Sequence, residues 1–231
     1  MDIELHAIEQ GEGPALFLLH GNGSEAAYFA AQIPYFAQRY HVIALDTRGH
    51  GASPAGTAPF TISQFADDLA DYMDARGIGQ AHILGFSDGG NIALVFALRH
   101  PDRVLSLILN GANLFFDGLE PAIQDEIRAD FERAHADEDR DPEAKHVADL
   151  QRLMMDEPNI DPEELGHLAM PALVIVGDDD MVKREHSELI ARSLPHAELR
   201  VIKGTHFIAE ECPEEFNSAV GEFLDRTAHT A

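Results

Sequence analysis

The stretch Ala81-His82-Ile83-Leu84-Gly85-Phe86-Ser87-Asp88-Gly89-Gly90 decides how this chain folds. It begins with a short apolar run, which is typical of a buried strand. Residues 91–100 (NIALVFALRH) continue as a nearly all-apolar segment that Pro101 stops, as expected for a helix packed on the centre of a sheet. We therefore predict a strand, a sharp turn at Ser87 and then a helix.

Ser87 is the candidate nucleophile because it sits at the centre of a G-x-S-x-G pattern. In such an elbow the serine takes a strained backbone conformation, and Gly85 and Gly89 let the strand and the helix approach closely. The strain exposes the hydroxyl at the strand tip, where the helix N-terminus favours developing negative charge. The pattern alone also fits a glycine-rich turn, but the strand before it and the helix after it favour the nucleophile.

His206 is the candidate base. A serine hydroxyl is a poor nucleophile until a base removes its proton, and that base must come from a loop at the same end of the sheet. The chain has 13 histidines, and His206 follows an expected strand within the turn Gly204-Thr205-His206-Phe207. A buried loop histidine without a catalytic role is the alternative interpretation.

Three aspartates follow the apolar run Ala172–Val176 and precede His206, which gives the chain order Ser, Asp, His. The turn must curl back over the end of the sheet before its side chain can reach the histidine. This favours the last of the three, Asp180, as the residue that orients the imidazole, with Asp178 as the next candidate. The remaining aspartates fit exposed turn positions.

Two main-chain N–H groups are expected to stabilise an oxyanion. One belongs to Asp88, directly after the nucleophile. The other should come from the loop His20-Gly21-Asn22-Gly23, where small residues let the backbone approach a substrate, and Asn22 is the expected donor. We interpret His20 as a structural brace of that loop.

Further apolar runs indicate a parallel sheet buried on both faces, because continuous apolar strands alternate with helical patterns. The expected strands beside 81–84 are Ala15–Leu19, His41–Leu45, Val104–Leu109, Ala172–Val176 and about Glu198–Ile202, with a closing helix over Pro213–Leu224. The predicted fold class is α/β.

Residues 114–170 differ from the rest of the chain because they contain no strand-like run. They show acidic amphipathic helices over Glu120–Ala136 and Glu143–Met155, then a short turn over 163–168. A segment inserted between two parallel strands should lie over their carboxyl ends. We therefore predict a core formed by residues 1–113 and 171–231, with 114–170 as a small helical cap.

The net charge of −25, from 16 basic and 41 acidic residues, argues against nucleic-acid and membrane-surface partners, because such a surface repels phosphate and anionic lipid. The single cysteine, Cys212, cannot form an internal disulfide. The N-terminus lacks a signal-peptide pattern, and no apolar run approaches the roughly 20 residues that span a bilayer. We predict a cytoplasmic protein that acts on a small molecule, as a monomer or a homodimer.

The chain resembles the α/β-hydrolase fold superfamily over essentially its whole length. The residues that carry this resemblance are His20-Gly21-Asn22-Gly23, Asp46-Thr47-Arg48-Gly49-His50-Gly51-Ala52-Ser53, Gly85 to Gly90, Gly177 to Asp180, and Gly204-Thr205-His206. The resemblance implies a mostly parallel central sheet with helices on both faces and a serine-nucleophile hydrolase. It implies a structural role for residues 46–53, selects Asp180 as the acid, and implies no cofactor and no metal.

The leading functional hypothesis is hydrolysis of a small carboxylic ester or thioester through a Ser87 acyl-enzyme, with His206 as base and then acid. Carbon–carbon bond hydrolysis or lyase chemistry on the same residues is the first alternative. A ligand-binding protein without catalysis is the second. The Asp88 side chain stays open between two roles: it is passive beside its own N–H, or it receives a cationic group of an ester.

Overall fold

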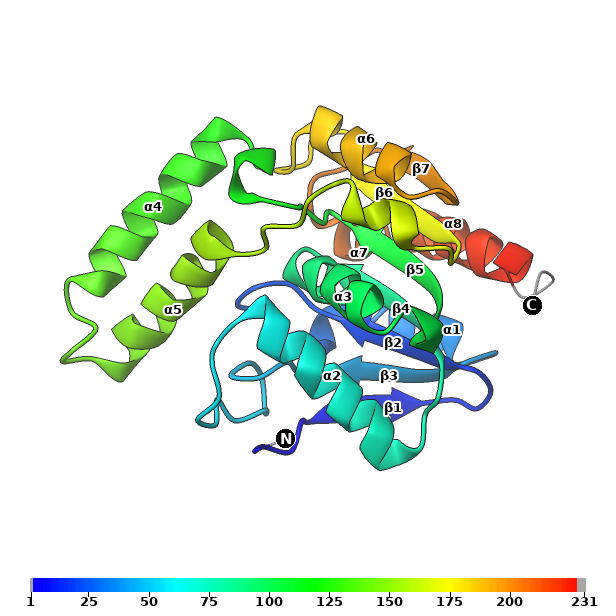
Figure 1. Cartoon of the computed structure of the whole chain (residues 1–231), viewed down its shortest axis with the longest axis horizontal. Coiled ribbons are helices and arrows are strands. Elements are labelled where there is room, and N and C mark those ends of the chain that lie inside the picture. Colours follow the sequence, from blue (N-terminus) through cyan, green and yellow to red (C-terminus); the bar gives the residue numbers. More distant parts are fainter. Residues whose placement is uncertain (1, 228–231) are drawn as a thin grey trace.

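The computed structural model describes residues 2–227, and its core within that range is a seven-stranded sheet. The strands are β1 (Ala7–Gln10), β2 (Ala15–Leu19), β3 (His41–Leu45), β4 (Ala81–Phe86), β5 (Val104–Asn110), β6 (Ala172–Gly177) and β7 (Ala197–Ile202). Their order in the sheet is β1-β3-β2-β4-β5-β6-β7 (Figure 1). Only the edge strand β1 is antiparallel to its neighbour, so the predicted mostly parallel sheet is confirmed.

Helices cover both faces of the sheet, as the continuous apolar strands predict. The longer ones are α2 (Ile62–Arg76), α3 (Asp88–Arg99), α4 (Pro121–His135), α5 (Pro142–Asp156), α6 (Arg184–Ser193) and α8 (Pro213–Thr227). The shorter ones are η1 (Ala26–Phe29), α1 (Gln32–Phe36), η2 (Pro101–Arg103), η3 (Phe116–Gly118), η4 (Glu164–His167) and α7 (Ile208–Glu211). None of the helices within residues 2–227 is both long and apolar enough to cross a membrane.

Alternate residues of each strand enter two separate hydrophobic cores, because successive side chains point to opposite faces. On β2, Phe17 and Leu19 join the core shared with α2, α3 and α6. Leu16 and Leu18 join the core shared with α1, α7 and α8. The sheet is therefore the middle layer of three, and its central strands β2 to β6 are buried from both sides.

The carboxyl ends of the parallel strands lie along one edge of the sheet. The register pairs Leu19 at the end of β2 with Gly85 near the end of β4, and Gly85 with Leu109 of β5. Gly177 at the end of β6 pairs with Ile202 at the end of β7. The loops that follow these strands therefore meet at this edge, where α/β sheets bind their ligands.

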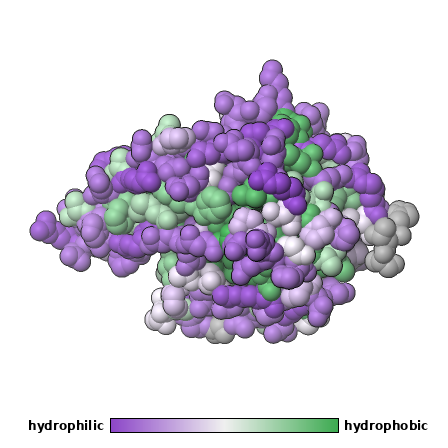
Figure 2. Space-filling view, turned by 45° about the horizontal axis from the view of Figure 1, so that its top comes forward, coloured by the Kyte–Doolittle hydropathy of each residue, from purple (hydrophilic) through white to green (hydrophobic). Residues whose placement is uncertain are grey.

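The helices α4 and α5 form a hairpin between β5 and β6 that projects away from the sheet (Figure 1). Their bounds differ by one residue from the helices expected over 120–136 and 143–155. Figure 2 shows hydrophobic surface running along this projection between hydrophilic borders. At its base, Leu119 and Ile127 pack on Val182, which anchors the hairpin beside the carboxyl edge.

Candidate active site

Ser87 occupies the junction between β4 and α3 with a strained backbone. Its φ of 53° and ψ of −121° make it the only non-glycine residue with positive φ within residues 2–227. Its N–H donates to the carbonyl of Asn110 on β5 at 2.8 Å, and its own carbonyl accepts from the N–H of Gly90 at 2.8 Å. A conformation of this kind costs about 1–3 kcal/mol, so the neighbouring strand and helix must hold it in place.

The glycines of the G-x-S-x-G pattern are required by close backbone packing. A Cβ atom added to Gly85 would lie 2.2 Å from the carbonyl oxygen of Gly89. One added to Gly89 would lie 2.0 Å from the carbonyl oxygen of Leu19 on β2. The first turn of α3 thus packs directly on two strands, and the predicted close approach at the elbow is confirmed.

Asp180 is the aspartate that contacts His206. The Nδ1 atom of His206 lies 2.7 Å from Oδ1 of Asp180, and their side chains are 5% and 3% exposed. Asp180 Oδ1 also accepts from the N–H of Val182 at 2.9 Å, which fixes the carboxylate. Asp178 is exposed and instead accepts from the N–H of Gly204 at 2.9 Å, so it joins the two loops without reaching the imidazole.

The imidazole of His206 lies beside the elbow. Its ring packs 4.8 Å from the ring of Phe86, measured between centroids. A Cβ atom added to Gly111 would lie 2.5 Å from Cε1 of His206, and Gly111 directly follows the Asn110 carbonyl that binds the N–H of Ser87. The buried Nε2 atom of His206 has no hydrogen-bond partner within residues 2–227, which leaves it available for proton exchange.

The loop after β2 lies against the elbow. A Cβ atom added to Gly21 would lie 3.1 Å from Cβ of Ser87. The main-chain N–H groups of Asn22 and Asp88 donate to no protein acceptor within residues 2–227, as expected of donors reserved for a substrate oxygen. These observations fit the predicted oxyanion donors.

His20 braces this loop in the way the sequence predicts. Its Nε2 accepts from the N–H of Thr47 at 3.0 Å, so its proton is on Nδ1, which lies 2.8 Å from the carbonyl oxygen of Gly21. Burial lowers the pKa of His20, which keeps the ring neutral. A neutral ring with both nitrogens engaged holds the loop and has no free site for catalysis.

The Asp88 carboxylate is buried and hydrogen-bonded within the protein. Its Oδ2 accepts from Nδ2 of Asn22 at 2.9 Å, and its Oδ1 accepts from Nδ2 of Asn91 at 3.2 Å. Burial raises the pKa of the Asp88 carboxyl, while the two amide donors act in the opposite direction. The side chain therefore takes part in a protein network.

A cavity of about 200 Å³ opens between Ser87 and the α4–α5 hairpin. Its apolar lining comes from Leu119, Ile123, Ile127, Met154 and Met181. Its acidic lining comes from Asp88, Glu126, Asp130 and Glu157, and no basic side chain lines it among the described residues. Because pockets for drug-sized ligands measure roughly 300–1,000 Å³, this cavity fits a small substrate.

Residues 14–157 match the model of the alpha/beta hydrolase fold family. This chain belongs to that family. Over 97% of this alpha/beta hydrolase and 96% of the relative, it is 30% identical to a putative carbamate hydrolase, RutD, of Caulobacter sp. strain K31.

Solved structures of similar hydrolases cover nearly the whole chain. A thermophilic esterase from Thermogutta terrifontis superposes with a TM-score of 0.83 at 27% identity, over 97% of this chain and 94% of that one. A meta-cleavage product hydrolase from Pseudomonas fluorescens IP01 gives a TM-score of 0.80 at 25% identity, over 97% and 95%. The chain is therefore an enzyme of the hydrolase class.

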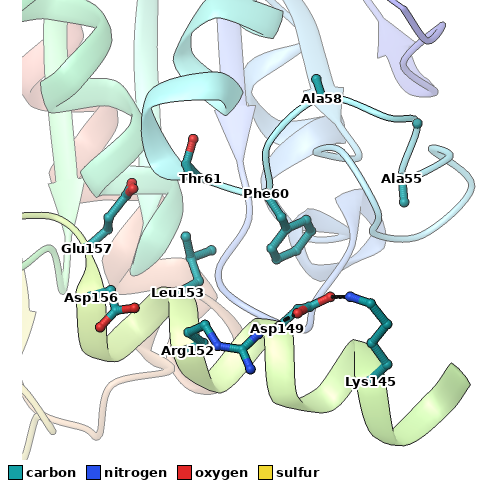
Figure 3. A pocket seen from close by; sticks show the side chains of 11 residues that line it. Ala55, Ala58, Phe60, Thr61, Lys145, Asp149, Arg152, Leu153, Asp156 and Glu157 are labelled. Carbon is teal, nitrogen blue, oxygen red and sulfur yellow. Dashed lines mark hydrogen bonds and ion pairs between the residues drawn. The ribbon is translucent and has the colours of Figure 1, made fainter. Parts of the chain in front are cut away.

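A larger hollow of about 490 Å³ in this hydrolase lies along α5 (Figure 3), and Ser87 is not among the residues that line it. Phe60 and Thr61 line one wall, and α5 supplies the other. The basic side chains of Lys145 and Arg152 both pair with Asp149, and Arg152 also pairs with Glu138, so both cations already have acidic partners within the protein. None of the predicted site residues lines this hollow, whereas Ser87 and Asp88 line the smaller cavity.

Three residues of the hydrolase site escaped the sequence interpretation: Asn91, Gly111 and Asn113. Asn91 is fully buried on α3, and Asn113 is 7% exposed and lines the small cavity. A polar residue inside the apolar run 91–100, one helical turn after Asp88, was the available signal for Asn91. For the other two, the signal was the turn sequence N-G-A-N directly after a buried strand.

Proposed function

We propose that this hydrolase cleaves a small carboxylic ester or thioester through an acyl-enzyme on Ser87. The observation that carries the proposal is the juxtaposition of the strained Ser87 with the buried His206–Asp180 pair. The unpartnered Nε2 of His206 supports it, because a serine hydroxyl needs such a base.

In the first half of the reaction, Ser87 Oγ attacks the carbonyl carbon while His206 Nε2 takes its proton. The Nδ1–H of His206 donates to Asp180, which orients the ring and stabilises its charged form. The N–H groups of Asn22 and Asp88, at the N-terminus of α3, stabilise the oxyanion. The C–O or C–S bond then breaks, and His206 protonates the leaving alcohol or thiol.

In the second half, a water molecule attacks the acyl carbon while His206 takes one of its protons. The tetrahedral intermediate collapses, the bond from the acyl carbon to Ser87 Oγ breaks, and His206 returns the proton to that oxygen. The products are the carboxylic acid and the regenerated enzyme.

The cavity lining supports a neutral or positively charged substrate. Four carboxylates surround a space of about 200 Å³ with no basic side chain in the described lining, and only Asp130 among them pairs with a cation, Arg133, so the net charge of the lining repels an anionic substrate. Asp88 already accepts two amide donors. A cationic group would therefore meet Glu126, Asp130 and Glu157, the acidic residues at the hairpin side of the cavity, before Asp88.

Carbon–carbon bond hydrolysis is the second candidate, because the similarity to a meta-cleavage product hydrolase extends over the whole chain. It predicts turnover of a vinylogous diketone with negligible ester turnover. The similarity to an esterase and the acidic cavity favour the ester. The RutD relative adds carbamates to the substrate panel.

The decisive experiment measures hydrolysis of p-nitrophenyl acetate and labelling by a fluorophosphonate probe. Wild type is compared with Ser87→Ala and with a matched control, Ser218→Ala, which removes an exposed hydroxyl on α8. We expect Ser87→Ala to lose labelling and the control to keep it. Equal labelling of wild type and Ser87→Ala would refute the assignment of the nucleophile.

A further inference from the structure

We propose that the side chain of Asn22 is a positioning device that couples the oxyanion loop to the α4–α5 hairpin. A single amide group, Nδ2 of Asn22, donates to Asp88 Oδ2 at 2.9 Å and to the carbonyl oxygen of Leu150 at 3.2 Å. Asp88 lies on the elbow helix α3, and Leu150 lies on α5. The inference rests on the proposed function, in which the N–H of this same Asn22 binds the oxyanion.

The Asp88 end of this contact belongs to a buried network. Asp88 Oδ1 accepts from Nδ2 of Asn91 at 3.2 Å, and the same Nδ2 donates to Oδ1 of Asn113 at 3.1 Å. The N–H of Asn113 donates back to Oδ1 of Asn91 at 2.9 Å. Asn91, Asp88 and Asn113 are 0%, 6% and 7% exposed. Buried polar groups whose partners are satisfied fix a unique geometry, because breaking any of them leaves an unpaired group.

The network meets the α4–α5 hairpin at two points. Asn113 stands where the chain leaves β5 for the hairpin, and its Nδ2 donates to the carbonyl oxygen of Phe115 at 3.2 Å. Leu150 lies in the second helix of the hairpin, and its Cδ1 would lie 3.8 Å from a Cβ atom at Gly23. A displacement of α5 would therefore move the acceptor that Asn22 uses, and with it the loop beside Ser87.

Small displacements of this loop matter because oxyanion stabilisation is geometric. A donor must lie about 2.7–3.1 Å from the oxygen in the transition state, and a misplacement of about 1 Å can lower the rate about a hundredfold. The side chain of Asn22 is thus placed to set the position of its own N–H. We expect its loss to lower kcat more than it raises KM, because the oxyanion forms only in the transition state.

Four variants separate the two bonds of Asn22. Asn22→Ala removes both and keeps the main-chain N–H. Asn22→Asp places a second carboxylate against Asp88. Combining Asn22→Asp with Asp88→Asn exchanges donor and acceptor, which restores the bond to the elbow and leaves the Leu150 carbonyl without its donor. Gln80→Ala is the control, since it removes an exposed amide that donates to the Asp102 carbonyl at the opposite end of β4.

Two readouts are measured on each folded variant: kcat and KM for p-nitrophenyl acetate, and hydrogen–deuterium exchange of a peptide covering residues 20–24. We expect Asn22→Ala to lower kcat about 10- to 100-fold with KM changed less than about threefold, and to speed exchange in the loop. Asn22→Asp should lower kcat more than Asn22→Ala does, because it places a second carboxylate against Asp88. The double variant should recover at least tenfold in kcat over Asn22→Asp and stay below wild type.

Two results would overturn the inference: kcat and loop exchange of Asn22→Ala within twofold of wild type, or a double variant no better than Asn22→Asp. Failure of the proposed function is distinguishable, because wild type would then neither hydrolyse the ester nor label at Ser87. In that case, the exchange of the loop still decides whether Asn22 holds it.

Discussion

The carboxylate of Asp180 and the imidazole of His206 form a buried pair with Oδ1 and Nδ1 separated by 2.7 Å. Residues 26 positions apart meet there because β6 and β7 are neighbours and the loops after them close over the same edge. Asp178 occupies the same turn and points its carboxylate at the main chain of Gly204. Of the two aspartates on this turn, Asp180 thus contacts the imidazole of His206, and Asp178 contacts the main chain of Gly204.

Asp180→Asn should abolish most of the activity, whereas Asp178→Asn should change it little. An amide at 180 favours the wrong imidazole tautomer and withdraws the charge that stabilises imidazolium, which costs roughly 10³- to 10⁴-fold in kcat by analogy with other hydrolase triads. An amide oxygen at 178 can still accept from Gly204. Steady-state kinetics with p-nitrophenyl acetate, measured on both variants and on wild type, check the two expectations. A larger loss in Asp178→Asn would mean that the acid is misassigned.

Gly111→Ala should displace the imidazole of His206, the proposed base. The new Cβ would stand 2.5 Å from Cε1 of His206, and φ at this position is +63°. Gly77→Ala is a matched control, because its φ is +66° and no atom lies within 4 Å of the new Cβ. Both variants should lose about 1 kcal/mol or more of stability from the left-handed backbone. Only Gly111→Ala should lose about 100-fold in kcat. Similar kinetics for the two variants would remove Gly111 from the site.

The charge on the acyl group of an ester substrate should control kcat/KM. We expect kcat/KM to be at least tenfold higher for glycine ethyl ester, which is cationic, than for monoethyl succinate, which is anionic. Glu126→Gln should lower the ratio of the two kcat/KM values about two- to fivefold, because an exposed charge contributes up to about 1 kcal/mol. Glu214→Gln on α8 makes the same charge change away from the cavity. Raising the salt concentration should also narrow the ratio. An anionic ester cleaved as fast as the cationic one would contradict the charge argument.

The free energy of unfolding should fall as the pH is lowered from 6.5 to 4. Burial lowers the pKa of His50, His82 and His186 to about 4 each. The unfolded chain protonates these rings below about pH 6.5, so it binds more protons than the native state in this window, and the free energy of unfolding rises with pH. Asp88, whose pKa burial raises, works in the opposite direction. We expect a slope of roughly 1–4 kcal/mol per pH unit in urea titrations.

The variant His82→Asn tests the source of that slope. An amide can keep the 2.8 Å contact that His82 Nδ1 makes with Oγ of Ser106, but it does not titrate. The slope of its free energy of unfolding against pH should be smaller than that of wild type by up to about 1.4 kcal/mol per pH unit, the contribution of one proton. An unchanged slope would show that other groups cause the acid sensitivity.

The buried ion pair between Arg48 and Asp68 should stabilise the fold far more than the surface ion pair between Arg99 and Asp67. Arg48 is fully buried and donates to both carboxylate oxygens of Asp68, each at 2.7 Å. Asp68→Asn leaves the buried guanidinium with the partly exposed Asp2 as its one remaining carboxylate among the described residues, and it should cost about 3 kcal/mol in chemical unfolding. Asp67 pairs with Arg99 at the surface, so Asp67→Asn should cost less than about 1 kcal/mol. Equal losses would contradict a structural role for residues 46–53.

The sequence predicted the central strands well because their apolar runs are continuous. The run Ala15–Leu19 coincides with β2, and His41–Leu45 with β3. The edge strand β1 was missed, since its sequence AIEQ is short, half polar and paired on one side only. Helix α6 was missed as well. Its sequence REHSELIARS carries few apolar residues, and the helix is stabilised by the packing of Ile190 into the hydrophobic core on one face of the sheet.

At the candidate site, the sequence predicts residues whose context is local and misses residues whose contacts depend on packing. Ser87 carries its context in the adjacent strand and helix, and Asp180 follows from the length of one turn. The contact of Gly111 with His206 joins segments 95 positions apart, and neither segment alone predicts it. The amide network of Asn91 has the same origin, because it joins α3 to Asn113 in the loop after β5 and, through Asp88, to Asn22 in the loop after β2.

The positive φ of Ser87 lowers the stability of the fold, while the hydroxyl at the same residue is required for the proposed reaction. A glycine at 87 would adopt this backbone without strain, and an alanine would keep the strain while losing the hydroxyl. Selection for folding alone would therefore favour glycine at this position. With Ser87 in its proposed role as nucleophile, selection for turnover is what keeps the serine, and a copy of this protein released from that selection is expected to drift toward a more stable and inactive form.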